Sequence, residues 1–132
     1  MDTSKENVLM CEKAEKIQQG RYPIDGDFYI LRNLEGAPDI IEVHGCVLYR
    51  DQQTPYKFIW LPRQDQLQEM VIDNTKGCDK WTWLLEFFFR WTNKSGFQNW
   101  SMEQLWLAFV MSEKYNKKWT GKEWRLNNVQ KV

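Results

Sequence analysis

Residues 56–71 read YKFIWLPRQDQLQEMV, and the spacing of the apolar side chains changes within this stretch. The residues Tyr56–Trp60 alternate as they do in a strand with one buried face. After Pro62 the apolar residues follow helical spacing instead, at Leu67, Met70 and Val71. We therefore expect a sheet before Pro62 and helices after it, which is the α+β class.

The residues before this stretch predict an N-terminal helix. Thr3 and Glu6 have the spacing of a capping box, and Gly20 is placed to end the helix. The apolar residues between them recur on one helical face, at Val8, Cys11, Ala14 and Ile17.

Two more strands are expected between this helix and Tyr56. Phe28–Leu31 is a short apolar run, and Ile40–Tyr49 is rich in β-branched and apolar residues, with Gly45 as a bulge or bend. The connections are short and polar, which favours an antiparallel sheet of about three strands.

Two longer helices are expected after residue 78. The first runs from Asp79 to about Thr92 and is apolar nearly all round, so it is either buried or an interface. Its inward face should comprise Trp81, Leu84, Leu85, Phe88 and Trp91. The second begins at a capping box of Ser101 with Gln104 and runs to about Tyr115. Its inward face should comprise Met102, Leu105, Ala108, Phe109 and Ser112.

These elements predict a single domain spanning residues 1–132, which is long enough to bury a core. The N-terminal helix occupies residues 1–20, and the sheet occupies residues 27–61. A helical part of three helices, residues 63–115, is expected to pack on the sheet, and an aromatic and basic tail follows at 116–132.

Composition excludes some classes of protein. Eighteen basic residues balance eighteen acidic ones, so there is no strong signal for nucleic-acid binding or for DNA mimicry. The three cysteines are far apart and do not form a CxxC motif. This pattern fits a protein of the reducing cytoplasm better than one with a disulfide framework. The polar start and the short apolar runs predict neither a signal peptide nor a membrane span. We expect a soluble, cytoplasmic protein with no membrane partner.

The tail carries the strongest candidate binding site, because bases and aromatic rings alternate within it. The expected ligand-binding residues there are Tyr115, Lys117, Lys118, Trp119, Lys122, Trp124 and Arg125. Aromatic faces stack on nucleobases, while Lys and Arg contact phosphate. The alternative is that Trp119 and Trp124 pack back on the last helix beside solvated lysines. Arg63 is added as a candidate anion ligand at a helix start, although such polar runs are also ordinary wet helix faces.

No pattern defines a reaction, so no catalytic residue, metal site or cofactor is expected. His44 and Cys46 lie on one face of a predicted strand, which keeps a Cys–His pair conceivable. An ordinary strand histidine beside a small buried thiol explains them better. The familiar phosphate, hydrolase, zinc and dinucleotide motifs do not occur.

Two segments carry a family resemblance: LPRQDQLQEM at 61–70, and SMEQLWLAFVM at 101–111, which continues through EKY at 113–115. With CEKA at 11–14 and GDFY at 26–29, they resemble small uncharacterised phage and prophage proteins of Gram-positive bacteria. The likeness spans the N-terminal helix and residues 60–124, but not 33–58. It implies a viral accessory protein working inside a bacterial cell, and it brings no activity with it.

Together these features predict a non-enzymatic binding protein that counters host antiviral defence by sequestering a nucleotide-derived ligand. The alternative, from another class, is an inhibitor of a host or defence protein, comparable to an anti-CRISPR protein, with exposed tryptophans as hot spots. The apolar helix Trp81–Trp91 adds self-association as a further alternative.

Overall fold

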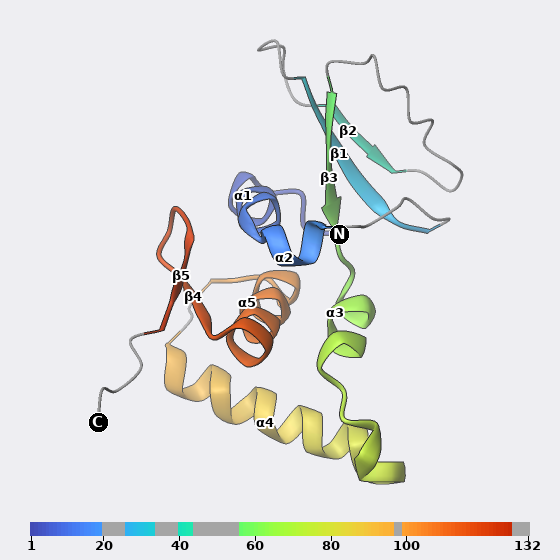
Figure 1. Ribbon diagram of the computed structural model, residues 1–132, viewed down its shortest axis with the longest axis vertical. Coiled ribbons are helices and arrows are strands. Elements are labelled where there is room, and N and C mark those ends of the chain that lie inside the picture. The colour runs from blue at the N-terminus through green and yellow to red at the C-terminus, as the bar shows by residue number, and fades with distance from the viewer. Residues whose placement is uncertain (20–25, 34–39, 44–55, 97–98, 128–132) are drawn as a thin grey trace. The chain divides into compact units, whose positions relative to one another are not determined.

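The structure, a computed structural model, describes residues 1–19, 26–33, 40–43, 56–96 and 99–127 (Figure 1). It is an α+β protein, mostly helical with a small antiparallel sheet, which confirms the predicted class. The chain forms two compact units, Met1–Arg63 and Gln64–Val132. The single domain, and the packing of the C-terminal helices on the sheet, stay predictions.

The N-terminal helix of the first unit is broken once. Helix α1 spans Lys5–Lys13 and α2 spans Glu15–Gln18, and the non-helical backbone of Ala14 (φ −80°, ψ 67°) separates them. The predicted apolar face is confirmed, because Val8, Cys11, Ala14 and Ile17 are all buried. The N-cap differs from the expected one. Ser4 caps α1, since its side chain accepts a hydrogen bond from the backbone N–H of Asn7 at 3.2 Å.

The three predicted strands form one antiparallel sheet. Strands β1 (Phe28–Asn33), β2 (Ile40–Val43) and β3 (Tyr56–Leu61) pair in the order β2-β1-β3, with Tyr29 opposite Trp60. The predicted second strand is seen only to Val43, because residues 44–49, with Gly45, lie outside the described part of the chain. In the order β2-β1-β3, strand β3 is an edge of this sheet, so its outward backbone groups need partners.

Gln18 supplies those partners at Trp60. The Trp60 backbone N–H donates to Gln18 Oε1 at 2.9 Å, and Gln18 Nε2 donates back to the Trp60 carbonyl at 2.7 Å. The same Nε2 also donates to the Cys11 carbonyl at 3.0 Å. One amide thus joins α1, α2 and β3, and it satisfies backbone groups that would otherwise be costly to bury.

The second unit is built from helices and a short hairpin. Its elements are α3 (Gln64–Val71), a 3₁₀ helix η1 (Asn74–Asp79), α4 (Lys80–Ser95), α5 (Met102–Tyr115), β4 (Lys117–Trp119) and β5 (Trp124–Leu126). The described residues therefore hold five α-helices and a second sheet, rather than four helices and an irregular tail. No helix within the described ranges combines the length and the apolarity needed to cross a membrane.

Helix α5, rather than α4, is the central helix of this unit. It contacts α3, α4 and β4, and every residue from Trp106 to Met111 is buried. The Ser101–Gln104 capping box is confirmed, but Met102, which was expected to face inward, is exposed.

Helix α4 lies along one side of α5 and buries only part of its surface (Figure 1). Leu84 and Phe88 are buried, as expected, and Trp91 is half-buried. The expectation that Trp81 and Leu85 also face inward is wrong, because both are exposed. A helix that packs mainly on one neighbour can bury only one stripe, so its other apolar residues stay outside.

The contact between α4 and α5 is a stack of aromatic rings. Phe88 lies flat on Trp106, with ring centroids 3.8 Å apart and planes 3° from parallel. Phe109 meets Phe88 and Trp106 edge-on, at 5.5 Å and 5.7 Å. The edge-on contacts are favourable for aromatic quadrupoles, and the stacked pair buries two ring faces against each other, so this cluster orients α4 on α5.

Candidate functional site

The basic and aromatic tail folds into a hairpin directly after α5. Asn116 ends the helix in the left-handed conformation (φ 53°), and its carbonyl accepts a hydrogen bond from the Asn127 N–H at 2.8 Å. At the turn, the Thr120 N–H donates to the Glu123 carbonyl at 2.9 Å, and Gly121 supplies the positive φ of 101°. Both ends of the hairpin are therefore tied, so its side chains have defined positions.

Trp119 and Trp124 face each other across this hairpin. They are paired residues of β4 and β5, and their ring centroids lie 5.1 Å apart at 54°. Only 7% and 8% of their surfaces are exposed. The structure therefore favours the alternative in which both rings pack back on the helical unit.

Their burial nevertheless creates a pocket of about 260 Å³ between the hairpin and the two long helices. Helix α4 contributes Trp91 and Lys94 from its last turns, and α5 contributes Ala108 and Ser112. The described residues that line it are Trp91, Lys94, Ala108, Ser112, Lys117, Lys118, Trp119, Trp124 and Asn127. We call this the tail pocket. These residues include three lysines and three tryptophans, and none of them is a carboxylate.

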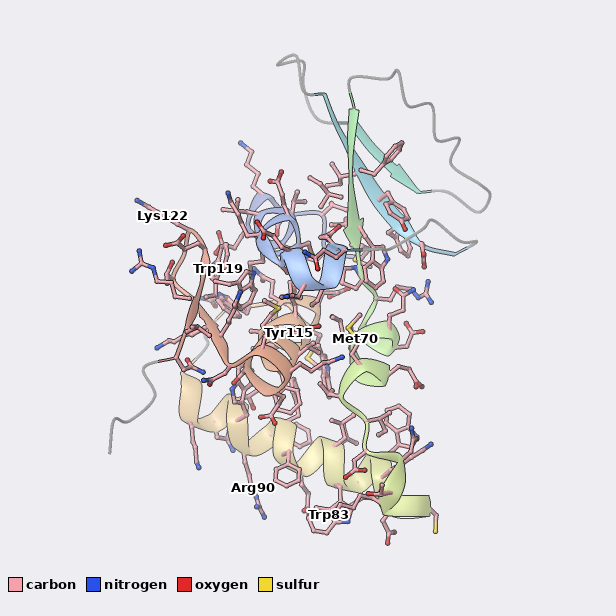
Figure 2. The ribbon with its side chains drawn as sticks, viewed as in Figure 1. Met70, Trp83, Arg90, Tyr115, Trp119 and Lys122 are labelled. Carbon is pink, nitrogen blue, oxygen red and sulfur yellow. The ribbon has the colours of Figure 1, made fainter. Side chains whose placement is uncertain are left out.

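Four of the residues expected to bind ligand are brought together here, namely Lys117, Lys118, Trp119 and Trp124. Three others lie apart from the lining. Tyr115 contacts Lys114, whose Nζ is 5.8 Å from the ring centroid. Lys122 lies in the hairpin turn (Figure 2), and Arg125 forms an exposed 2.7 Å ion pair with Glu123.

Arg63 belongs to the first unit and is engaged there. Its Nη1 donates to the Gly26 carbonyl and lies 3.7 Å from Oδ1 of Asp27, which is buried. A buried carboxylate needs a compensating cation, so this contact gives Arg63 a structural role. It is not among the residues that line the tail pocket.

The sequence analysis did not identify the pocket residues that come from α4, from α5 and from the end of the hairpin. Trp91 was assigned to the core, and Lys94, Ser112 and Asn127 were not considered as ligand contacts. A usable signal existed on α5, because Ala108 and Ser112 are small residues four positions apart on one helical face. Small side chains beneath large indoles leave space between a helix and the hairpin that covers it.

The charges of the tail pocket differ from those of two other cavities. A cavity of about 310 Å³ beside α4 mixes Lys76, Lys80 and Lys114 with the carboxylates of Asp73 and Glu113. A cavity in the first unit includes Glu12 and Glu15 in its lining. Among the described lining residues of these three cavities, only those of the tail pocket carry charges that are all positive, which suits an anion.

The aromatic and polar side chains of the tail pocket widen the range of chemical groups that it can bind. Indole faces stack on flat rings, lysine ammonium groups contact phosphate or carboxylate, and the Ser112 hydroxyl and the Asn127 amide can both donate and accept hydrogen bonds. The volume lies near the lower end for small-molecule sites, which suits a ligand of about mononucleotide size or smaller.

The two residues considered for enzyme chemistry, His44 and Cys46, lie outside the described residues, so their pairing stays a prediction. Of the described cysteines, Cys78 is exposed, whereas Cys11 is buried and its thiol donates to Oδ1 of Asn7 at 4.0 Å. No group of three or more His, Cys, Asp or Glu side chains gathers within the described ranges to hold a metal ion.

Comparison with protein-family models, with curated proteins and with solved structures gave no match to this chain.

Proposed function

We propose that this chain is a non-enzymatic binding protein that sequesters a small, flat, anionic ligand of the nucleotide-derived class in the tail pocket. The observation that carries the proposal is the described lining of this pocket, in which Lys94, Lys117 and Lys118 accompany three indoles and no carboxylate is found among the described residues. Base stacking and phosphate contact need this combination of groups.

The biological setting is part of the proposal and rests on the resemblance to phage and prophage proteins. A viral accessory protein that removes a nucleotide-derived ligand from the bacterial cytoplasm would counter a defence that depends on that ligand. Sequestration requires binding without turnover, and the stacking and charge groups of the tail pocket supply binding.

A thermal-shift screen with a panel of mono-, di- and cyclic nucleotides tests the proposal. A ligand that binds only the native state raises the melting temperature, by an amount that grows with its concentration over its Kd. The wild-type chain should be stabilised by at least one phosphate-bearing nucleotide, and the corresponding nucleoside should have a weaker effect.

Two single variants make the screen site-specific. Lys118→Gln removes a cation from the pocket lining, whereas Lys122→Gln removes the same charge from the hairpin turn outside it. Loss of one exposed lysine–phosphate contact should weaken binding about fivefold, because such contacts contribute about 1 kcal/mol. Equal affinities of the two variants, or no stabilisation of the wild type by any nucleotide, would overturn the assignment.

A second candidate function, inhibition of a host or defence protein, is favoured by a different surface. Trp83 and Phe87 are exposed on α4, stack at 5.9 Å, and line the cavity beside Lys76, whose Nζ is 4.8 Å from the Trp83 ring centroid. An exposed aromatic pair beside a hollow is typical of an interface hot spot. Co-purification of one host protein with the wild type but not with Trp83→Ala would support this function.

A further inference from the structure

A separate stripe of large apolar side chains on α4 faces solvent. Trp81, Leu85 and Phe89 are spaced four residues apart, so they lie on one face of the helix. Their exposed fractions are 40%, 42% and 61%. We call them the outer stripe. None of them lines the tail pocket or the cavity that Trp83 borders, so neither ligand site explains their apolar character.

We propose that the outer stripe is a homodimer interface, in which α4 packs antiparallel against α4 of a second copy. The stripe is symmetric about Leu85, with one aromatic residue four positions before it and another four positions after it. A two-fold axis passing beside Leu85 places Leu85 on its own equivalent and Trp81 on Phe89 of the other copy. Isologous dimers require this kind of self-complementarity.

The positions beside the stripe are mostly uncharged. Thr82 and Thr92, which border it at helical spacing, carry no charge, and the Thr92 hydroxyl is already bonded to the Phe89 carbonyl at 2.9 Å. Glu86 also borders the stripe, three positions before Phe89, and the stripe itself contains no polar atom other than the indole N–H of Trp81.

The area of the stripe predicts a weak dimer. Large side chains of this kind present about 150–250 Å² each, so the exposed fractions leave roughly 300 Å² of stripe per copy. Two copies would bury about 600 Å² from the stripe, which is about half the lower limit of roughly 1,200 Å² for specific, stable complexes, so the association should be weak and transient. The association should therefore depend on concentration.

The dimer is independent of the proposed ligand function. The outer stripe ends at Phe89, whereas the α4 residues that line the tail pocket are Trp91 and Lys94. Each copy would keep its own pocket, so a failure of ligand binding leaves the dimer prediction intact, and the reverse also holds.

Sedimentation velocity over a hundredfold range of concentration tests the dimer. The wild-type mass should rise from that of one chain to that of two. Leu85→Asp places a charge on the two-fold axis and should hold the chain as a monomer at every concentration, whereas Glu86→Asp, one position outside the stripe, should leave the association unchanged. Circular dichroism of both variants shows whether they are folded.

Cysteine cross-linking tests the symmetry in the intact chain. In a background where Cys46 and Cys78 are serine, Leu85→Cys should cross-link to itself under mild oxidation, and Glu86→Cys should not. A mixture of Trp81→Cys and Phe89→Cys chains should give a mixed dimer. A wild-type chain that stays monomeric throughout, a dimer that survives Leu85→Asp, or equal cross-linking of the two single cysteines would overturn the proposal.

Discussion

Phe88 and Phe89 are neighbours on α4 but lie in opposite environments. Phe88 is 2% exposed and stacks on Trp106, while Phe89 is 61% exposed and belongs to the outer stripe. Replacing each of them with alanine, in separate variants, removes the same atoms one residue apart. The pair therefore tests which side of α4 packs on α5, and both the tail pocket and the outer stripe depend on that orientation.

The expected magnitudes differ severalfold. Phe88→Ala leaves a cavity against Trp106 and Phe109, and large-to-small changes of this kind cost about 3–5 kcal/mol. A chain of 132 residues typically has roughly 7–20 kcal/mol of total stability, so this loss is a large share of it. Phe89→Ala removes a mostly solvated side chain and gains helix propensity, so its effect should be within about 0.5 kcal/mol of zero.

Urea unfolding followed by far-ultraviolet circular dichroism measures both variants. It should be run at low protein concentration, because Phe89 is also part of the proposed dimer interface and association would add to its apparent stability. Equal losses for the two variants, or a larger loss for Phe89→Ala, would show that α4 is rotated from the orientation described and would refute the reasoning.

Three further predictions concern single side chains. Ser101→Ala should lower the free energy of unfolding by about 1 kcal/mol in the same urea assay, because it removes the N-cap of the central helix; no change would contradict the cap. Gln18→Ala should cost about 2–4 kcal/mol, since the buried N–H and carbonyl of Trp60 lose their partner, and a near-neutral result would show that the bridge is dispensable. The pKa of Asp73 should be below its ordinary value, because the Thr75 hydroxyl and then the Thr75 N–H donate to its carboxylate. Its contribution to stability is present above the unfolded pKa and is lost as pH falls through the folded pKa; an NMR titration in which Thr75→Val leaves that pKa unchanged would contradict this cause.

The assignment of the central helix shows where periodicity stops being informative. The apolar content of α4 suggested the core, and that of α5 suggested a one-sided helix, whereas α5 is buried almost all round and α4 is not. Periodicity reports which residues share a face, but the number of neighbours that cover the helix depends on the rest of the fold. Leu84 and Phe88 were correctly placed inside, whereas Trp81 and Leu85 of the same predicted face are exposed.

For the candidate site too, the sequence predicts one part and the fold decides the other. Its lysines and tryptophans were recognisable as a candidate, because the residue types themselves determine what they can bind. The hairpin then separated Lys117 and Lys118, which line the pocket, from Lys122 and Arg125, which do not. Lys122 lies in the turn of the hairpin and Arg125 pairs with Glu123, so this selection depends on how the hairpin folds.

The sequence by itself determined the α+β class, the three strands of the first unit, the capped start of α5 and the chemistry available in the tail. These follow from local rules of periodicity, capping and residue type, which act over a few residues. Tertiary structure alone decided that Trp91 and Lys94 of α4 meet the hairpin, and that Trp81, Leu85 and Phe89 stay outside. Those outcomes depend on packing between segments far apart in the chain, where the shape of one surface decides what another can cover.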